Sequence, residues 1–444
     1  MGRQGLPELP GSLVEYTEIL GDYDYFTLLT PYEYCGNKRV AAVGCTMKLN
    51  HVQVGRSPLD NAKVRLSGSL CVQRGLDDVE VWFDVDEDLA EGLATSGAPW
   101  LIALLPYAME YGGTIEIDRP TDSLLVENAL MLGRVYRKWY PNLKPYEIVA
   151  DRQIISTNAD KSVSFFSGGI DGMHTALRHS PLAGPDQVGT VDELLMIWGF
   201  DIDLDTPQEF VAMYGNSQAF AEHLGVPLRS MATNIRRPNT YWKRLWGPLC
   251  HSMGRAACAH ALEGRYKSAV WGSNFLAEDS VPEGSHPWTD PYCSSTNLRT
   301  AVDGNAHSRM DKVAFLARYP WALENVHVCY RDLVSRNCGE CIKCVRSAIA
   351  IDLAGLAGSC RTLPVPLRPE VIQNAYCGDK FERIFFREML EYARATGRSD
   401  IERSLSIALR RSGYLRPLMD FAEWGKQKTA VWRLSRMLTK AIAG

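Results

Sequence analysis

The sequence has no apolar run that reaches the roughly 18–20 residues needed to cross a bilayer, so we expect no membrane-spanning helix and no membrane partner. Its N-terminal residues also lack the basic start and the long apolar core of a signal peptide. We therefore expect a cytoplasmic protein, whose twelve cysteines are reduced thiols or metal ligands and not disulfides. Internal repeats and low-complexity segments are missing as well, which excludes a solenoid or a fibrous chain.

A large excess of one charge is also missing. The formal net charge is -4 and 23% of the residues are charged, which is typical of a soluble globular protein and predicts no general attraction to nucleic acid. Residues 380–444 are an exception, with fourteen Lys and Arg against seven Asp and Glu. Such a basic tail is either a solvated helical face or a polyanion-binding surface, and we favour the solvated face. Nucleic acid is therefore a partner that the sequence allows but does not favour.

The length of 444 residues predicts two or three domains. We expect a mixed α/β domain over residues 1–150, a doubly wound parallel α/β domain over 151–365 and a basic helical region over 366–444. In the first, strands are predicted at 39–43, 63–70 and 79–85, helices at 100–111 and 123–140, and a linker at 140–146. In the second, strands at 162–166, 194–200, 226–231 and 268–271 alternate with helices at 173–178, 209–224 and 249–262. Ligands of such a sheet bind at the carboxyl ends of its strands.

One strand-to-helix turn has the composition of a phosphate site. Ser167-Gly168-Gly169-Ile170-Asp171 follows the first strand of the second domain. Glycines allow the backbone to approach a ligand, and successive N–H groups at a helix N-terminus bind anions. The hydroxyl of Ser167 can bind a phosphate oxygen, and Asp171 can hold Mg²⁺ or cap the helix. Neither a GxxxxGK[ST] loop nor a GxGxxG fingerprint is present, which excludes the two commonest alternatives.

Four cysteines form a second signal. Cys329, Cys338, Cys341 and Cys344 have the spacing C-x8-C-x2-C-x2-C, with Gly339 available for a tight turn. Four thiolates this close together suit tetrahedral Zn²⁺, and an iron–sulfur cluster is the competing interpretation. The spacing therefore predicts a metal site, whichever of the two metals occupies it.

These two motifs carry a resemblance to a known family. Ser-Gly-Gly-Ile-Asp after a buried strand is similar to the SGGxDS loop (the PP-loop) of the N-type ATP pyrophosphatases, which cleave ATP between the α and β phosphates. Gly172 stands where the motif has Ser or Thr. The cysteine spacing downstream resembles 7-cyano-7-deazaguanine synthase and its relatives, in which it binds a structural zinc. The resemblance covers about residues 160–355 and implies MgATP, a PP-loop fold and zinc.

The resemblance also implies roles for residues between the motifs. Asp290, with His286 as a weaker candidate, corresponds to a proline–aspartate pair that faces substrate, and a capped turn made by Pro287 and Asp290 is the equally weighted alternative. Arg309 and Lys312, three residues apart on one helical face, correspond to a Thr-Lys segment that faces the nucleotide phosphates. Phe200 and Asp201 lie where that fold places adenosine. The predicted nucleotide-binding residues are thus Ser167, Gly168, Gly169, Ile170, Asp171, Gly172, Phe200 and Asp201, and the predicted catalytic residues are Asp171, Asp290, Arg309 and Lys312.

We expect an ATP-dependent enzyme that releases AMP and pyrophosphate. It would adenylate a carboxylate or amide-type oxygen of a small-molecule or peptide acceptor, and ammonia or an amine would then displace AMP. A PP-loop sulfur transferase acting on tRNA or a metabolite is one alternative. The other is a catalytically degenerate, zinc-stabilised module that binds a nucleotide or a partner. We also expect a homo-oligomer.

Overall fold

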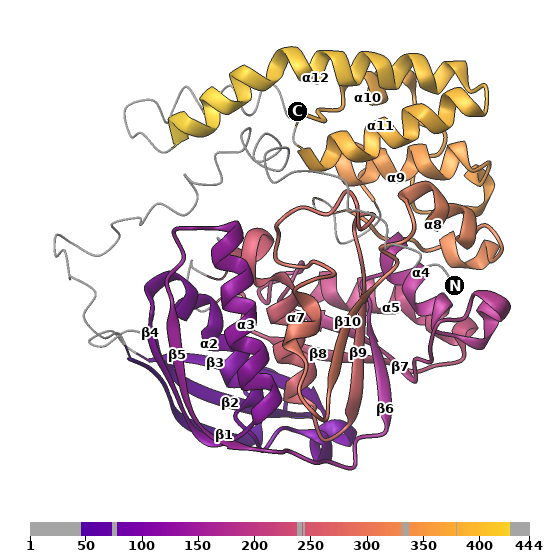
Figure 1. The fold of residues 1–444 in the computed structure, drawn as a ribbon. Coiled ribbons are helices and arrows are strands. Elements are labelled where there is room, and N and C mark those ends of the chain that lie inside the picture. The colour runs from indigo at the N-terminus through magenta and orange to yellow at the C-terminus, as the bar shows by residue number, and fades with distance from the viewer. Residues whose placement is uncertain are drawn as a thin grey trace, which may run out of the picture.

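The computed structural model describes residues 46–72, 78–237, 242, 245–329, 331, 337–378 and 380–426, and the predicted strand at 39–43 lies outside these ranges. Ten strands form one sheet in the order β10-β9-β6-β7-β8-β3-β2-β1-β4-β5 (Figure 1). Six of the neighbouring pairs are parallel and three are antiparallel. The strands are β1 (Thr46–Arg56), β2 (Lys63–Cys71), β3 (Val79–Asp86), β4 (Gly113–Asp122), β5 (Tyr146–Gln153), β6 (Lys161–Phe165), β7 (Glu193–Trp198), β8 (Leu228–Thr233), β9 (Tyr266–Gly272) and β10 (Arg299–Asp303).

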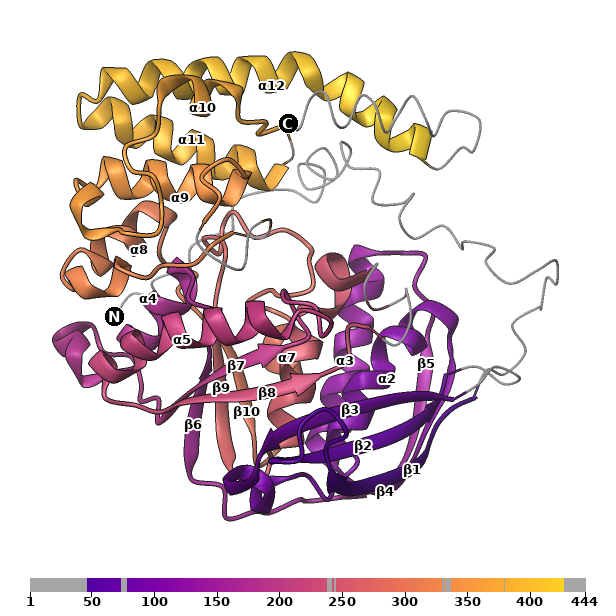
Figure 2. The ribbon, with the colours of Figure 1, turned by 180° about the vertical axis from the view of Figure 1, so that it is seen from behind.

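Helices cover both faces of this sheet. Figures 1 and 2 show α2, α3 and α7 on one face and α4 and α5 on the other. Each face has its own apolar core, one built around α2 and α7 and the other around α4, α5 and α9. The helices are α2 (Ala98–Tyr111), α3 (Ser123–Trp139), α4 (Ile170–Arg178), α5 (Pro207–Leu224), α7 (His251–Ala261), α8 (Arg309–Leu316), α9 (Ile342–Leu353), α10 (Pro369–Asn374), α11 (Lys380–Ala395) and α12 (Ser399–Lys426). None of the described helices is both long and apolar enough to span a membrane.

The predicted α/β class is confirmed, with a large and mostly parallel sheet between helices. Strand β7 is buried along nearly its whole length, as expected for a strand covered on both faces. Helix α5 ends at Gly225, which adopts the left-handed conformation (φ 77°, ψ 24°) that stops a helix. The predicted linker at 140–146 is a short turn between α3 and β5, and Leu143 and Tyr146 in it are buried.

The two predicted α/β regions share the sheet. Strand β3 pairs antiparallel with β8, with Phe83 opposite Thr233 and Val85 opposite Met231. Because this pairing joins the first five strands to the last five, the boundary expected near residue 150 lies within one continuous sheet. The N-terminal strands extend the sheet and belong to the same core as β6 and β9.

The strand order creates a crevice for a ligand. From β6 the chain passes through α4 to β7 on one side, and the neighbour on the other side, β9, is reached later through α7 on the opposite face. The loops after β6 and β9 therefore leave in different directions from adjacent strand ends. Such a switch point in a parallel sheet is where ligands of α/β folds bind.

The C-terminal helices form a further layer. Figure 1 shows α10, α11 and α12 stacked beyond α9 and α8, at the end of the sheet where the carboxyl ends of β6 and β9 lie. Phe385 and Phe386 of α11 are buried in the core that contains α8 and α9. The region beyond residue 366 is thus helical as far as residue 426, and it packs directly over the crevice.

Candidate functional site

A cavity of about 500 Å³ occupies the crevice, which is within the range of small-molecule sites. One wall is formed by the turn after β6 and by α8, α9 and α11, and the other by the loop after β7 and the start of α7. Among the described residues, five arginines and lysines line it against three acidic residues, so this part of its wall favours an anion. These charged residues are Arg236, Arg255, Arg309, Lys343, Arg346, Asp171, Asp201 and Glu283.

The glycine turn lies at the floor of this cavity. Gly168 has a φ of +73°, and a Cβ there would lie 3.3 Å from the Ser217 hydroxyl, so both backbone shape and space favour glycine. Its carbonyl oxygen accepts a hydrogen bond from the His327 backbone N–H at 2.8 Å, which fixes the turn. Gly169 then begins α4 in an extended conformation, without a side-chain cap from any described residue. The first amides of α4 therefore lack a side-chain acceptor among the described residues, which is compatible with the anion site predicted at Ser167–Gly172.

Gly172 has a different environment. It lies in the first turn of α4, and a Cβ there would make only ordinary contacts, 3.6 Å from the Phe166 ring and 3.8 Å from the Ser167 nitrogen. A serine at this position thus fits without strain. The departure from the SGGxDS pattern is not imposed by packing.

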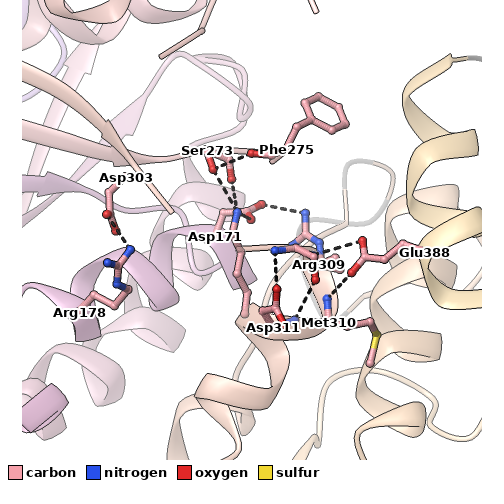
Figure 3. A network of polar contacts seen from close by, with 11 residues as sticks. Asp171, Arg178, Ser273, Phe275, Asp303, Arg309, Met310, Asp311 and Glu388 are labelled. Atoms are coloured by element: carbon pink, nitrogen blue, oxygen red, sulfur yellow. Dashed lines mark hydrogen bonds and ion pairs between the residues drawn. The ribbon is translucent and has the colours of Figure 1, made fainter. Parts of the chain in front are cut away.

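Asp171 joins the turn to two cations on α8. Its carboxylate accepts from the Arg309 guanidinium at 2.9 Å and from Lys312 Nζ at 3.0 Å (Figure 3). Burial by itself would raise the pKa of Asp171, but the charges of Arg309 and Lys312 outweigh it and hold that pKa well below its usual range. The structure thus brings together three of the four predicted catalytic residues.

The two cations differ in what they can reach. Lys312 is only 1% exposed and also donates to the Ser273 carbonyl oxygen at 2.6 Å, so it ties the end of β9 to α8. Arg309 lines the cavity, and its buried Nε has no hydrogen-bond partner among the described residues. Arg309 is consequently the cation that keeps a donor for a ligand, whereas Lys312 supports the carboxylate from behind.

Helix α11 holds this arrangement in place, which the sequence did not predict. Glu388 accepts from the backbone N–H of Met310 at 2.7 Å and of Arg309 at 3.3 Å, so it caps the start of α8 (Figure 3). Glu382, also on α11, pairs with the cavity residue Arg346 at 2.8 Å. Glu388 therefore holds the backbone at the start of α8, and Glu382 orients the Arg346 guanidinium, which lines the cavity.

Aromatic rings from the loop after β9 and from α11 complete the same wall. Phe275 stacks on Phe381 and Phe385, with ring centroids 5.4 and 5.1 Å apart. The guanidinium groups of Arg346 and Arg309 lie 4.2 and 5.2 Å from the Phe385 ring, a cation–π arrangement that fixes both. All five side chains line the cavity, which makes α11 a part of the site.

Phe200 and Asp201 lie on the far wall, at the end of β7 as predicted. Phe200 packs against Trp246 at 4.7 Å between ring centroids, and Arg236 lies over Trp246 while bonding to Asp201 at 3.3 Å. Together with Met213, these rings give that wall an apolar, aromatic surface. It is suited to a planar ring such as a base.

Asp290 fixes a turn, which is the second of the two interpretations that the sequence left open, and it does not face the cavity. Its carboxylate accepts from the Trp271 indole N–H and the Ser285 hydroxyl, each at 2.7 Å, and from the His286 backbone N–H at 2.8 Å. It is fully buried and is not among the residues that line the cavity in the described chain. His286 is likewise buried against Trp139, and burial lowers its pKa to about 4. Both residues fix the loop after β9, and neither reaches the cavity.

Arg255 and Glu283 are two of the cavity residues that the sequence did not predict. Arg255 comes from α7, and Glu283 comes from the loop that Asp290 holds. Burial, with a smaller contribution from the charge of Asp290, raises the pKa of Glu283 to about 8. No motif or periodicity marks either position, because only the packing of α7 against the end of β9 brings them to the cavity.

The four cysteines form a compact group beside the cavity. All four sulfur atoms lie within 4.8 Å of one another, and three of the cysteines are buried. The Sγ atoms are 3.9 Å apart for Cys329–Cys341 and Cys338–Cys344 and 3.3 Å apart for Cys341–Cys344. Thiolates around one tetrahedral Zn²⁺ stand about 3.8 Å apart, given Zn–S bonds of about 2.3 Å. The predicted group is thus present and can hold a metal ion such as zinc.

Comparison with known proteins adds no further constraint. No protein-family model matches the chain, and no curated protein or solved structure matches it either. The site must therefore be interpreted from its own geometry.

Proposed function

We propose that this protein is an ATP-dependent enzyme of the PP-loop type that releases AMP and pyrophosphate. The observation that carries the proposal is the meeting, in one cavity, of the uncapped glycine turn Ser167–Gly172 with Arg309 and Arg346. Backbone amides and guanidinium groups together suit the phosphates of a nucleotide. The aromatic wall of Phe200 and Trp246 lies across the cavity and would take the base.

The mechanism needs positioning and charge neutralisation from the protein. The turn would hold the β and γ phosphates, and Arg309 would neutralise the charge that develops on the departing pyrophosphate. Asp171 would act by orienting Arg309, because both of its carboxylate oxygens already accept from cations. This pairing does not fit a role as a Mg²⁺ ligand in the observed conformation, so we assign Mg²⁺ to the substrate, as the MgATP complex.

The acceptor is an oxygen nucleophile, a carboxylate or amide-type oxygen, which attacks the α phosphate and expels pyrophosphate. An amine or ammonia then attacks the adenylated carbon, loses a proton and expels AMP. Glu283 lines the cavity and is mostly protonated at pH 7, because burial raises its pKa to about 8, so the proton released by the amine leaves to solvent.

We propose zinc for the cysteine group, in a structural role. An iron–sulfur cluster distributes its four thiolates over several irons, which keeps the sulfurs further apart than a single ion does. The short Sγ–Sγ distances favour the single ion. Cys344 lies in α9 two residues before the cavity residue Arg346, so the metal would anchor this wall.

Sulfur transfer is less well supported. Cys293 and Cys250, the thiols considered for a persulfide, are both fully buried. Within the described chain, Cys329 is the one cysteine that lines the cavity, and it belongs to the metal group. A persulfide relay would need an exposed thiol close to the nucleotide.

The proposal is tested by nucleotide binding and by product analysis. Calorimetry with an ATP analogue carrying a methylene between its α and β phosphates should show binding that is lost in Arg309→Met. It should be unchanged in the control Arg318→Met, whose exposed guanidinium pairs with Asp186 away from this cavity. ATP incubated with the protein and a cellular small-molecule extract should then yield AMP and pyrophosphate. Formation of ADP, or binding without turnover in every extract, would favour a different phosphate chemistry or the degenerate module.

A further inference from the structure

Arg255 differs from the other arginines of the cavity in having no carboxylate partner. Arg309 pairs with Asp171, Arg346 with Glu382 and Arg236 with Asp201. Arg255 makes only two long hydrogen bonds, of 3.4 Å to the Ser285 hydroxyl and 3.3 Å to the His251 ring, and no ion pair with any residue that the structure describes.

Trp271 and His251, two neighbours of Arg255, supply no negative charge either. Its guanidinium lies 5.6 Å from the centre of the Trp271 ring, in a half-buried position on the cavity wall. Burial first, and then the charge of Arg255, lower the pKa of His251 well below its usual range, so this neighbour is a neutral acceptor and supplies no negative charge. A partly desolvated cation without a counter-ion is costly, and an anionic ligand group would offset that cost.

Glu283 faces the same cavity and is also without a hydrogen bond or ion pair from its carboxyl group to any described residue. It does not form an ion pair with Arg255, although both line the cavity. At neutral pH most of its carboxyl group is protonated, because its pKa is about 8. An arginine and a neutral carboxylic acid together offer donors to both oxygens of a carboxylate.

The position of this pair separates it from the phosphate-binding residues. Arg255 belongs to α7, which covers one face of the sheet, whereas the glycine turn opens α4 on the other face (Figures 1 and 2). The phosphate-facing cations Arg309 and Arg346 come from α8 and α9, on the α4 side. A nucleotide with its phosphates on the turn and its base against Phe200 and Trp246 would therefore leave Arg255 and Glu283 for a second molecule.

We propose that Arg255 and Glu283 form the acceptor subsite, which binds the acceptor through a free carboxylate opposite the nucleotide. The inference rests on the proposed function and narrows it, because it selects a carboxylate over an amide oxygen as the group that is adenylated. Arg255 is assigned the binding of the carboxylate, and Glu283 lies beside it. Trp271, over which the Arg255 guanidinium lies, gives the subsite a flat apolar neighbour.

The test uses benzoate and its neutral isostere benzamide as probes on the full-length protein. Saturation-transfer NMR should detect benzoate but not benzamide, and benzoate binding should fall about tenfold or more in Arg255→Met, the loss of about one charged contact. Arg318→Met, which removes an exposed arginine elsewhere, should leave benzoate binding unchanged. Equal binding of the two probes, no binding of benzoate at millimolar concentration, or full binding by Arg255→Met would overturn the assignment.

A second readout needs no variant and so does not depend on whether Arg255→Met folds. Phenylglyoxal modifies unpaired guanidinium groups, and mass spectrometry can follow the reaction at Arg255. Benzoate, and not benzamide, should slow this modification, including when the methylene ATP analogue saturates the protein. Protection of Arg255 by the analogue alone would assign Arg255 to the nucleotide and overturn the proposal. Absence of analogue binding with intact benzoate protection would instead count against the nucleotide function only.

Discussion

At the scale of single residues, the site depends on how charge is paired in a small, partly dry volume. Asp171, which the sequence presents as a metal ligand or helix cap, is instead the common partner of Arg309 and Lys312. Both cations are nearly fully buried, so the carboxylate compensates their desolvation. Its role in the cavity is to keep these charges in place.

Replacement of Asp171 by Asn should therefore be costly. We expect Asp171→Asn to lower the free energy of unfolding by about 2–4 kcal/mol at pH 7, because it leaves two buried cations without a counter-charge. Asp186→Asn removes an exposed ion pair with Arg318 and should cost under about 1 kcal/mol. Denaturant unfolding measures both. Equal losses in the two variants would contradict the role of Asp171.

The difference in unfolding free energy between the wild type and Asp171→Asn should depend on pH in one direction. The folded-state pKa of Asp171 is lowered, so its contribution to stability is complete above its unfolded pKa, about 3.9. It is lost as the pH falls from there through the folded pKa. The gap between wild type and Asp171→Asn should thus narrow on acidification below about pH 4.

Substitutions at Gly168 and Gly172 should have different effects, one on the stability of the protein and the other on ATP binding. Gly172→Ser adds a hydroxyl where a Cβ meets only ordinary contacts, and we expect it to strengthen ATP binding without loss of stability. Gly168→Ala imposes a Cβ on a residue with φ +73°, close to Ser217, and should destabilise the protein by about 1 kcal/mol or more. Calorimetry with ATP measures the binding effect of Gly172→Ser, and thermal unfolding measures the stability effect of Gly168→Ala. Weaker ATP binding by Gly172→Ser would mean that the glycine itself is needed.

At the scale of elements, α11 connects the C-terminal region to the site. It supplies the cap of α8 through Glu388, the partner of Arg346 through Glu382 and two rings of the cavity wall. The basic composition of residues 380–444 gives no hint of this, because the contacts are made by two of the few acidic residues and by phenylalanines.

Glu388→Gln should uncouple α8 from α11. We expect a loss of about 0.5–2 kcal/mol in stability, as for other helix caps, and weaker pyrophosphate binding because Arg309 is less well oriented. Glu391→Gln, on the same helix and exposed, is the matched control and should change neither. Calorimetry with pyrophosphate checks the binding. Unaltered affinity in Glu388→Gln would assign it to stability alone.

The cysteine group joins the loop at Cys338 to the start of α9. Metal analysis should find about one zinc per chain, and Cys341→Ser should lose it. Because a structural metal contributes directly to folding, both the variant and chelation should lower the melting temperature markedly. Cys258→Ser, a buried cysteine outside the group, should retain the metal. Iron and acid-labile sulfide in place of zinc would contradict the single-ion geometry.

At the scale of the whole molecule, the sheet makes one unit of regions that the sequence appears to separate. Strands β3 and β8 are hydrogen-bonded, and a single apolar core extends from β1 and α2 to α7 and β9. Stability should consequently not divide at residue 150.

Calorimetry should show a single unfolding transition that includes the regions before and after residue 150. Phe83→Ala, in a fully buried position of β3, should cost about 3–5 kcal/mol and shift that whole transition. The tryptophan fluorescence and the far-UV circular dichroism signal should move together. Two separated transitions, with only one displaced by Phe83→Ala, would show independent domains.

Much of the fold was predictable because its signals are local. The apolar run at β7, the turn after β6, the Gly225 stop of α5 and the spacing of the cysteines all depend on neighbours in the sequence. Strands β1, β4, β5 and β10 were not predicted. Long exposed stretches interrupt the apolar pattern of β1, and β10 has five residues with only one fully buried. Their pairing comes from partners far away in the chain.

The sequence by itself determined the α/β alternation, the glycine turn before α4 and the spacing that brings the four cysteines together, because backbone conformation and the reach between nearby residues are set over a few residues. Only the tertiary structure decided that Asp171 pairs with two cations, that Asp290 fixes a loop, and that α11, Arg255 and Glu283 belong to the cavity. Charge pairing and desolvation depend on which side chains become neighbours in the folded protein. Long-range packing determines these neighbours, and no local sequence pattern encodes it.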